Sequence, residues 1–301
     1  MKKFFHDVVD INRIVKTEGK EAIYYAFGFL QAVLLMLKGC RYIYEISDIL
    51  YGYPKYSFLQ FLFKKIDAIV VRHSVVTVMT SEGFREYLFG KENPSNIVIL
   101  PNKLNNYFVN FKRESSRKID PNHIVFSFVG AVRYRETVLR FAKIVGKYFK
   151  CHEFHFYGDS SFVNSFKQET SEYDNVKFFG AYKNPEDLEA IYSNIDIVVA
   201  CYESISLNER IAEPNKLYES LFFEKPIVVS KDTYLARQVK KYKCGWSINA
   251  YSDDEIKDFI KSLSENILNE IILNEHIIPS SQLLDNEDDL LKLINEKCLI
   301  N

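Results

Sequence analysis

The sequence has few cysteines and no excess of charge of either sign. Its five cysteines lie far apart in 301 residues and are odd in number, so neither a disulfide framework nor a zinc cluster is indicated, and a reducing compartment fits. Lysine and arginine number 39 against 40 aspartates and glutamates, which gives a formal net charge of −1. A protein that binds nucleic acid by general electrostatic attraction is normally strongly basic, so we expect no nucleic-acid partner.

Long hydrophobic runs are also missing. The nearest approach to a membrane-spanning segment is 22–37, which includes Gln31 and is too short to cross a bilayer as a helix. The first residues mix charged and apolar side chains, so they do not read as a signal peptide. We therefore expect a cytoplasmic protein, which Lys64, Lys65, Arg72 and neighbouring aromatic residues could attach peripherally to the inner face of the membrane.

What the sequence does contain is apolar material in short runs, with 47% hydrophobic residues. Runs of strand length alternate with helix-length segments, a pattern that predicts an α/β fold of doubly wound parallel sheets. The predicted strands are 23–27, 42–46, 68–71, 75–79 and 97–100, followed by 124–130, 154–158, 176–180, 195–200 and 226–230. The predicted helices include 29–37, 56–65, 136–149, 161–169, 185–193 and 215–223.

The length suits two domains, and a polar stretch at 112–122 separates the two halves. The N-terminal domain, the C-terminal domain and the tail are placed at 1–115, 116–280 and 281–301. Within the C-terminal domain, apolar residues from Ile256 to Ile271 recur on one helical face. They predict an amphipathic helix that begins just after Ser252.

Three predicted strands of the second half end in glycine, at Gly130, Gly158 and Gly180. Because ligands bind outside the carboxyl ends of parallel strands, these glycines mark the edge of the sheet where a site is expected. After Gly130 the loop carries Arg133 and Arg135, just before a predicted helix. Guanidinium groups beside a helix N-terminus are typical of a phosphate site, although the same arginines could simply lie in a solvated loop.

A second group of polar residues is the string EPNKLYE at 213–219, in which Pro214 suits a helix start. Lys216 and Glu219 are three residues apart and therefore share one helical face. The carboxylate there could accept both hydroxyls of a ribose. Taken alone, the string would favour an ordinary surface ion pair.

Five strings occur in a characteristic order: FVGAVRYRET, FHFYG, VKFFGAY, DLEAIYSNIDIVVACYES and EPNKLYESLFFEKPIVVS. Together they resemble the C-terminal, donor-binding half of GT-B glycosyltransferases, above all the retaining glycosyl transferases group 1 type that builds bacterial surface polysaccharides. The resemblance covers 124–249. It implies two Rossmann-like domains, the first incomplete, and transfer of a hexose from a UDP- or GDP-sugar to a glycan or lipid-linked acceptor in capsule, O-antigen or exopolysaccharide assembly.

The resemblance also implies roles for individual residues. A basic residue after the first strand binds the donor diphosphate, a position that Arg133 matches best and Arg135 second, while the carboxylate of Glu219 binds the ribose. The implied binding residues are Gly130, Arg133, Tyr134, Arg135, Gly158, Asn215, Lys216, Leu217 and Glu219. The residues implied for catalysis are Asp48, Arg133, Glu213 and Lys216.

No separate cofactor is expected, since the nucleotide sugar is itself the donor substrate. No metal is expected either, since the Asp-x-Asp motif of the other major glycosyltransferase fold is absent.

Two departures from the family pattern affect these roles. Ile211 stands where the first of the family's paired glutamates belongs, so Glu213 would substitute from a shifted position. In the N-terminal half, Ser47 lies near the point where many relatives carry a histidine at the cleft. This leaves Asp48, or else Glu45, as the polar candidate on the acceptor side.

The N-terminal half also looks short for this family. If 23–27 is about the fourth strand, the usual first strands have no counterpart in the 22 residues before it. Either translation begins upstream, or the chain has been shortened, or this is a naturally reduced relative. The alternative function is then a catalytically inactive nucleotide-sugar-binding or assembly subunit. A shortened sheet exposes a strand edge or an apolar face, which predicts a protein partner there.

Overall fold

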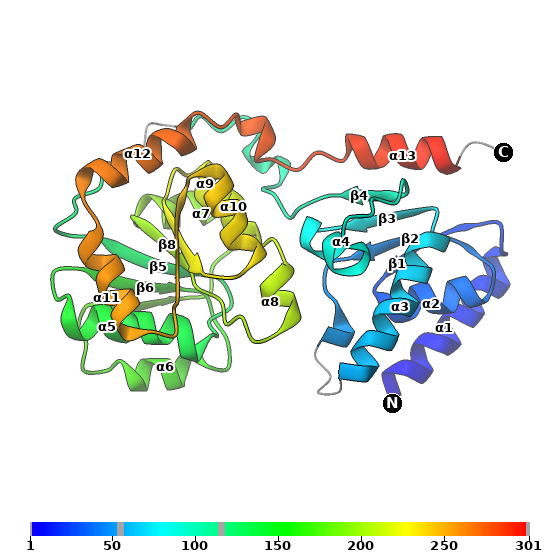
Figure 1. Ribbon diagram of the computed structural model, residues 1–301, viewed down its shortest axis with the longest axis horizontal. Helices are drawn as coiled ribbons and strands as arrows, with labels where there is room; N and C mark the ends of the chain where they lie inside the picture. The colour runs from blue at the N-terminus through cyan, green and yellow to red at the C-terminus, as the bar shows by residue number, and fades with distance from the viewer. Residues whose placement is uncertain (1, 53–56, 114–117, 299–301) are drawn as a thin grey trace. The chain divides into compact units, whose positions relative to one another are not determined.

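The computed structural model describes residues 2–52, 57–113 and 118–298, and it divides the chain into two compact units (Figure 1). Unit 1 consists of Met1–Asn102, Ser206–Glu213 and Asn286–Asn301. Unit 2 consists of Lys103–Ile205 and Pro214–Asp285. The boundary predicted between 115 and 116 falls among residues 114–117, outside the described residues. The structure changes unit after Asn102, and two later segments return to unit 1.

Unit 1 is built around a four-stranded parallel sheet in the order β1-β2-β3-β4. Its strands are β1 (Ile23–Phe27), β2 (Arg41–Ile46), β3 (Val76–Met79) and β4 (Ile97–Ile99). Its first helices are α1 (Lys2–Glu18), α2 (Phe29–Leu37), α3 (Ser57–His73) and α4 (Glu82–Phe89). One face of β2 is buried under α2 and α3, because Tyr42, Tyr44 and Ile46 join Leu35 and Val70 in one apolar core.

The other face of this sheet is only partly covered. The last helix, α13 (Asp288–Cys298), packs Leu290 against Ile43 of β2. Tyr25 of β1 pairs in register with Ile43 and therefore lies on the same face, but it is 43% exposed, and Phe27 is 68% exposed. The β1 side of the face thus carries apolar residues in contact with solvent.

The strand predicted at 68–71 is wrong, because these residues lie within α3. Val70 and Val71 are fully buried whereas Ile69 is 47% exposed, as expected for a helix with one buried face. A short apolar run cannot by itself distinguish a strand from a buried helical segment. The helix predicted at 56–65 exists but continues to His73; its first residue, Tyr56, is outside the described residues.

Unit 2 contains a six-stranded parallel sheet in the order β10-β9-β8-β5-β6-β7. Its strands are β5 (Val125–Val129), β6 (Glu153–Tyr157), β7 (Val176–Gly180), β8 (Ile197–Ala200), β9 (Ile227–Ser230) and β10 (Gly245–Ile248). The five strands predicted for this half are confirmed as β5 to β9, and β10 is an additional edge strand. With two parallel sheets, the α/β class predicted from the sequence is confirmed.

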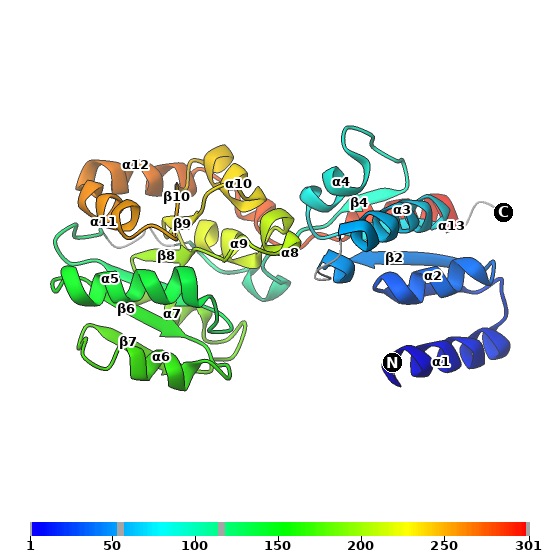
Figure 2. The same cartoon turned by 60° about the horizontal axis from the view of Figure 1, so that its bottom comes forward.

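Helices cover both faces of the six-stranded sheet (Figure 2). They are the π-helical segment η3 (Arg135–Leu139), then α5 (Arg140–Tyr148), α6 (Val163–Glu169), α7 (Leu188–Ser193), α9 (Asn215–Phe222), α10 (Tyr234–Tyr242), α11 (Asp253–Ser262) and α12 (Glu265–His276). Alternate residues of β5 face opposite cores: Phe126 packs with Phe141 of α5, whereas Val125 shares a core with Leu217 of α9.

The amphipathic helix predicted from Ile256 to Ile271 is two helices, α11 and α12. Its start is as expected, because the Ser252 side chain accepts a hydrogen bond from the Glu255 N–H. Leu263 and Ser264 are extended, however, and break the helix between the two parts. No helix within the described residues is long and apolar enough to span a membrane.

The strand order determines where a ligand can bind on unit 2. From β5 the chain proceeds outward to β6 and β7, then crosses to β8 on the other side of β5 and continues to β9 and β10. In doubly wound sheets, the crevice that binds ligands lies at the carboxyl ends of the two strands at which the order reverses, which here are β5 and β8. This is the topological switch point of the sheet.

Candidate functional site

The carboxyl ends of β5 and β6 touch at two glycines. A Cβ atom on Gly158 would lie 1.8 Å from the carbonyl oxygen of Gly130, so no larger residue fits there. Gly130 has a φ of 144°, and a Cβ atom on it would lie 3.8 Å from the Cε atom of Lys216. The structure thus brings the stem of Lys216, on α9, beside the end of β5.

The loop after β5 is tied to the loop after β8. Tyr134 has left-handed backbone angles (φ 73°, ψ 67°), unusual for a large residue and typical of functional loops, and the π-helical segment η3 follows it directly. The Tyr134 ring lies 4.9 Å from the ring of Tyr202, which follows β8. The Glu136 N–H donates to the carboxylate of Glu203 at 2.9 Å. This hydrogen bond joins the residues after β8 to the first turn of η3.

The two predicted arginines have different surroundings. Arg133 is exposed, and its guanidinium lies 4.9 Å from the centre of the Tyr134 ring. Arg135 is ion-paired with Glu169 of α6 and donates to the Ser165 hydroxyl at 3.0 Å. It lines a hollow of about 350 Å³ beside α5. Arg133 therefore lies beside Tyr134 in the loop after β5, whereas Arg135 lines a separate hollow.

Glu219 of α9 is the centre of a buried hydrogen-bond cluster. Its Oε1 accepts from the Asn215 amide at 2.6 Å. Its Oε2 accepts from the Tyr192 hydroxyl at 2.6 Å and from the Lys216 ammonium. The side chains of Lys216 and Glu219 are only 6% and 3% exposed, so this is not a surface ion pair. Burial raises the pKa of Tyr192, and the charge of Glu219 raises it further, so Tyr192 remains a proton donor.

Tyr202 links the two sides of the crevice electrostatically. Burial raises its pKa most, the nearby Tyr134 and Glu219 raise it further, and the positive charge of Arg133 lowers it. Arg133 and Glu219 therefore act on the same hydroxyl group. The loop after β5, the residues after β8 and the first turns of α9 together form one neighbourhood, which we call the switch-point cluster: Gly130, Arg133, Tyr134, Tyr192, Tyr202, Asn215, Lys216 and Glu219.

The two other residues implied for catalysis belong to unit 1. Asp48 follows β2 and is exposed, and the backbone of the next residue, Ile49, is held on both sides by the Asn208 amide. Glu213 is buried and ends the segment Ser206–Glu213. Glu45 lies within β2 and accepts a hydrogen bond from the Tyr25 hydroxyl at 2.7 Å. None of these three is part of the unit that carries the switch-point cluster.

Sequence reasoning missed two members of the switch-point cluster, Tyr192 and Tyr202, and also Glu203, which accepts a hydrogen bond from the Glu136 N–H. Tyr202 and Glu203 come directly after β8, and polar residues that follow a strand next to the first strand of a doubly wound sheet are a recognisable signal. Tyr192 gives no such signal, because it lies near the end of a short helix, α7, and follows no strand. Leu217, predicted as a binding residue, is fully buried in the core between α9 and the sheet.

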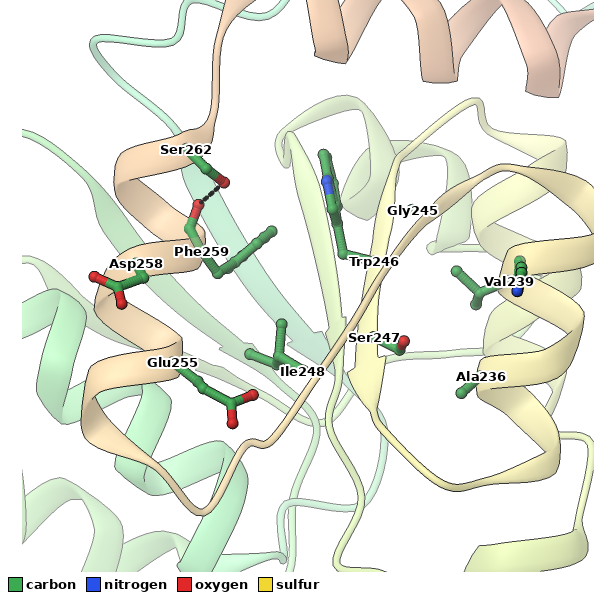
Figure 3. Close-up of a pocket in the computed structure, with 11 residues that line it drawn as sticks. Ala236, Val239, Gly245, Trp246, Ser247, Ile248, Glu255, Asp258, Phe259 and Ser262 are labelled. Atoms are coloured by element: carbon green, nitrogen blue, oxygen red, sulfur yellow. Dashed lines mark hydrogen bonds between the residues drawn. The ribbon is translucent and has the colours of Figure 1, made fainter.

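A larger hollow of about 510 Å³ lies elsewhere on unit 2, at the edge strand β10 (Figure 3). It is lined by α10, β10 and α11, with Trp246 and Phe259 in contact at a ring separation of 5.1 Å. None of the predicted site residues lines it. The candidate site is therefore defined by the switch point of the sheet rather than by this hollow.

The switch-point cluster combines cations, a buried carboxylate and a closely packed backbone. Lysine and arginine side chains next to glycine backbone suit phosphate groups, and a carboxylate suits sugar hydroxyls. Over residues 2–52, 57–113 and 118–298, no group of three or more His, Cys, Asp or Glu side chains is placed to hold a metal ion.

Comparison with known families decides what kind of protein this is. The model of the family described as "Glycosyl transferases group 1" matches residues 110–278, more than half of the chain. The chain belongs to this family. The matched range includes all the strands of the six-stranded sheet and the whole switch-point cluster of this group 1 glycosyltransferase. The sequence matches no curated protein.

Solved structures agree on the fold of this glycosyltransferase. A glycosyltransferase from Rickettsia africae matches with a TM-score of 0.67 at 15% identity, covering 99% of this chain and 82% of that one. HepE from Anabaena, solved with UDP and glucose, matches at 0.66 and 13%, covering 95% and 79%. Sucrose-phosphate synthase from Thermosynechococcus elongatus matches at 0.67 and 12%, covering 96% and 75%. These likenesses show the GT-B fold of two Rossmann-like domains.

Proposed function

We propose that this group 1 glycosyltransferase transfers a hexose, with retention of configuration, from a UDP- or GDP-sugar to a glycan or lipid-linked acceptor in the assembly of a bacterial surface polysaccharide. One observation carries the proposal. At the switch point of the six-stranded sheet, Lys216 lies between a buried carboxylate, Glu219, and the glycine end of β5. A nucleoside diphosphate has the two chemical groups, phosphate and ribose, that such an arrangement suits.

The cations of the cluster would act on the leaving group. When the sugar–phosphate bond breaks, negative charge develops on the departing diphosphate, and Arg133 and Lys216 would stabilise it. Fixed charges are most effective where water is excluded, and Lys216 is buried. Gly130 and Gly158 would allow the phosphates to approach the backbone. Arg135 is left out of this role because Glu169 already pairs with it.

A protein of the same fold that was solved with a bound nucleotide supports the proposed donor. HepE, which shares the fold, was solved with UDP and glucose. On the acceptor side, Asp48 of unit 1 is the proposed polar contact, whereas Glu213 is proposed in place of the first of the family's paired glutamates. Asp48 stands on a loop whose next residue is held by the Asn208 amide, so its backbone position is well defined.

Isothermal titration with UDP and with GDP tests the donor proposal directly. We expect one of them to bind, and Arg133→Ala to weaken that binding by about tenfold or more, the usual loss for a hydrogen bond to a charged group. Lys143→Met is the matched control, because it removes one positive charge paired to Glu169 on the same unit but outside the cluster. Absence of binding by both nucleotides at millimolar concentration would refute the proposal.

A second candidate function is that of a catalytically inactive nucleotide-sugar-binding or assembly subunit. The exposed row on β1 favours it, since Ile23, Tyr25 and Phe27 are 39%, 43% and 68% exposed on one face of an edge strand. Hydrolysis or transfer of the donor by the purified chain separates the two candidates. Nucleotide binding without turnover, together with self-association or partner binding in light scattering, would favour the subunit.

We also propose that the protein attaches peripherally to an anionic membrane surface through α3. Phe58, Phe61 and Leu62 are exposed there by 73%, 55% and 41%, and Lys64 and Lys65 follow on the same helix. Apolar side chains flanked by lysines suit the boundary between headgroups and acyl chains. Co-sedimentation with phosphatidylglycerol vesicles should be lost in the double variant Phe58→Ser/Phe61→Ser and reduced by salt. Equal sedimentation of variant and wild type would contradict it.

A further inference from the structure

The contacts of Glu219 leave too few acceptor positions for a ribose. A carboxylate offers about four lone-pair positions, two on each oxygen. Among the described residues, three donors already use them: Asn215 on Oε1, and Tyr192 and Lys216 on Oε2. Two neighbouring ribose hydroxyls need two positions, and about one remains. A ribose can therefore bind to Glu219 through both hydroxyls only if one of the three donors leaves.

Tyr192 is poorly placed to leave. Its side chain is fully buried, and its ring is stacked on Phe223 with the ring centres 4.6 Å apart and the planes 16° from parallel. Moving it would open a cavity in the core between α7, α9 and the sheet. Its high pKa also keeps the hydroxyl protonated, so it remains a permanent donor to the carboxylate.

Asn215 and Lys216 differ in what they could bind instead. Asn215 is neutral, so no ionic partner would compensate for the bond that its amide gives up. Lys216 carries a full charge at the end of a flexible stem, and its Cε lies next to the position of a Gly130 Cβ, where the phosphates are proposed to bind. Of the three donors, Lys216 is the one for which a bound nucleotide provides a second anion within reach.

We infer that Lys216 changes partner when the donor binds, leaving the Glu219 carboxylate for the diphosphate and so freeing Oε2 for a ribose hydroxyl. This rests on the proposed function. No covalent bond changes and no proton moves; one ion pair replaces another. A nucleoside without phosphates offers Lys216 no replacement, and a buried ammonium without an anion is strongly unfavourable. The site therefore recognises the ribose hydroxyls only in ligands that also carry the diphosphate.

A cycle of four ligands tests this on the unmodified protein. The probes are UDP, 2′,3′-dideoxy-UDP, uridine and 2′,3′-dideoxyuridine, or the guanine series if GDP is the nucleotide that binds, followed by ligand-detected NMR titration. We expect loss of the hydroxyls to weaken the diphosphate by about tenfold or more, the value of a hydrogen bond to a charged group, and the nucleoside by less than about twofold. An equal loss in both pairs would overturn the inference.

Lys216→Met provides the second test. It removes the competitor for Glu219, so uridine should bind more tightly than to the wild type while UDP binds about tenfold more weakly, and the hydroxyls should now contribute equally in both ligands. Lys143→Met, which breaks a partly exposed lysine–glutamate pair outside the cluster, should leave all four affinities unchanged. Weaker binding of uridine and UDP alike in Lys216→Met would overturn the exchange.

The outcomes separate this inference from the proposed function. If the wild type binds neither UDP nor GDP, the proposed function fails and the inference fails with it. If UDP binds but the ribose hydroxyls contribute the same with and without phosphates, the proposed function stands and the exchange is wrong. The ligand cycle on the wild type decides the matter even if Lys216→Met does not fold.

Discussion

The two sheets of this glycosyltransferase are built from the same kind of unit but are covered to different extents. Every residue of β5, β8 and β9 in unit 2 is buried, whereas β1 of unit 1 has exposed residues at alternate positions. The proposed donor site therefore lies at the ends of inner strands that are packed on both faces, which hold side chains precisely. The acceptor-side candidate Asp48 instead follows β2, which pairs with the partly exposed edge strand β1. Four measurements test this difference between the two sheets.

The largest effect is expected in the core of unit 2. Phe126 is fully buried and contacts Phe141 and Phe259, so Phe126→Ala should lower the free energy of unfolding by about 3–5 kcal/mol. Urea denaturation measures this loss. A change below about 1 kcal/mol would mean that the core of unit 2 is much looser than the packing indicates.

The next largest difference in stability is expected between replacing a buried arginine of unit 2 and replacing a surface arginine of unit 1. Arg113 donates to the carbonyl oxygens of Leu221, Phe222, Glu275 and Ile278 and pairs with Glu224. Arg113→Gln should cost about 3–5 kcal/mol, because it removes the cation that pairs with the buried Glu224 carboxylate and the guanidinium that donates to these carbonyl oxygens. In unit 1, Arg72 pairs with Glu92 at the surface, and Arg72→Gln should change stability by less than about 1 kcal/mol. Similar losses in the two variants would remove this part of the contrast.

Unit 1 should show a characteristic pH dependence. Burial raises the pKa of Asp67 to about 6, although hydrogen bonds from Tyr51 and Tyr44 oppose the shift. The folded form then holds its proton more tightly than the unfolded chain, so this contribution to stability is complete below about pH 4 and lost as the pH rises to about 6. The loss is at most about 3 kcal/mol. Asp67→Asn should flatten the profile between pH 4.5 and 7; parallel profiles would contradict the assignment.

The smallest effect is expected at the open edge. Phe27→Ala should change the free energy of unfolding by no more than about 0.5 kcal/mol, because the side chain is 68% exposed. The same variant should reduce self-association in light scattering if the edge binds a second molecule. A loss above about 2 kcal/mol would show that Phe27 is covered in solution and would remove the contrast between the two sheets.

The sequence alone could predict those elements that have a clear local pattern. Strands β5 to β9 are short apolar runs between helices, and three of them end at the glycines that mark the sheet edge. Neighbouring residues alone are therefore enough to predict them. The run at 68–71 is equally apolar but belongs to α3, and no local feature distinguishes it. The break between α11 and α12 depends on the backbone angles of two residues and was likewise missed.

The site was predictable in part for the same reason. Gly130, Arg133, Lys216 and Glu219 follow from strand ends and helix spacing, and the structure brings them into one neighbourhood. The ion pair of Arg135 with Glu169 joins residues 34 positions apart, and the bond from Tyr192 to Glu219 joins residues 27 positions apart. Such pairings are set by how helices pack on the sheet, which a single sequence does not contain.

The division of the chain has a practical consequence for anyone wishing to produce the donor half alone. The chain passes from one unit to the other after Asn102, Ile205, Glu213 and Asp285, so no single cut separates the two. Removing 1–102 would leave α8 (Leu207–Ile211) and α13 without the apolar residues of unit 1 on which they pack. A usable fragment would run from Lys103 to Asp285 with 206–213 replaced by a short polar linker.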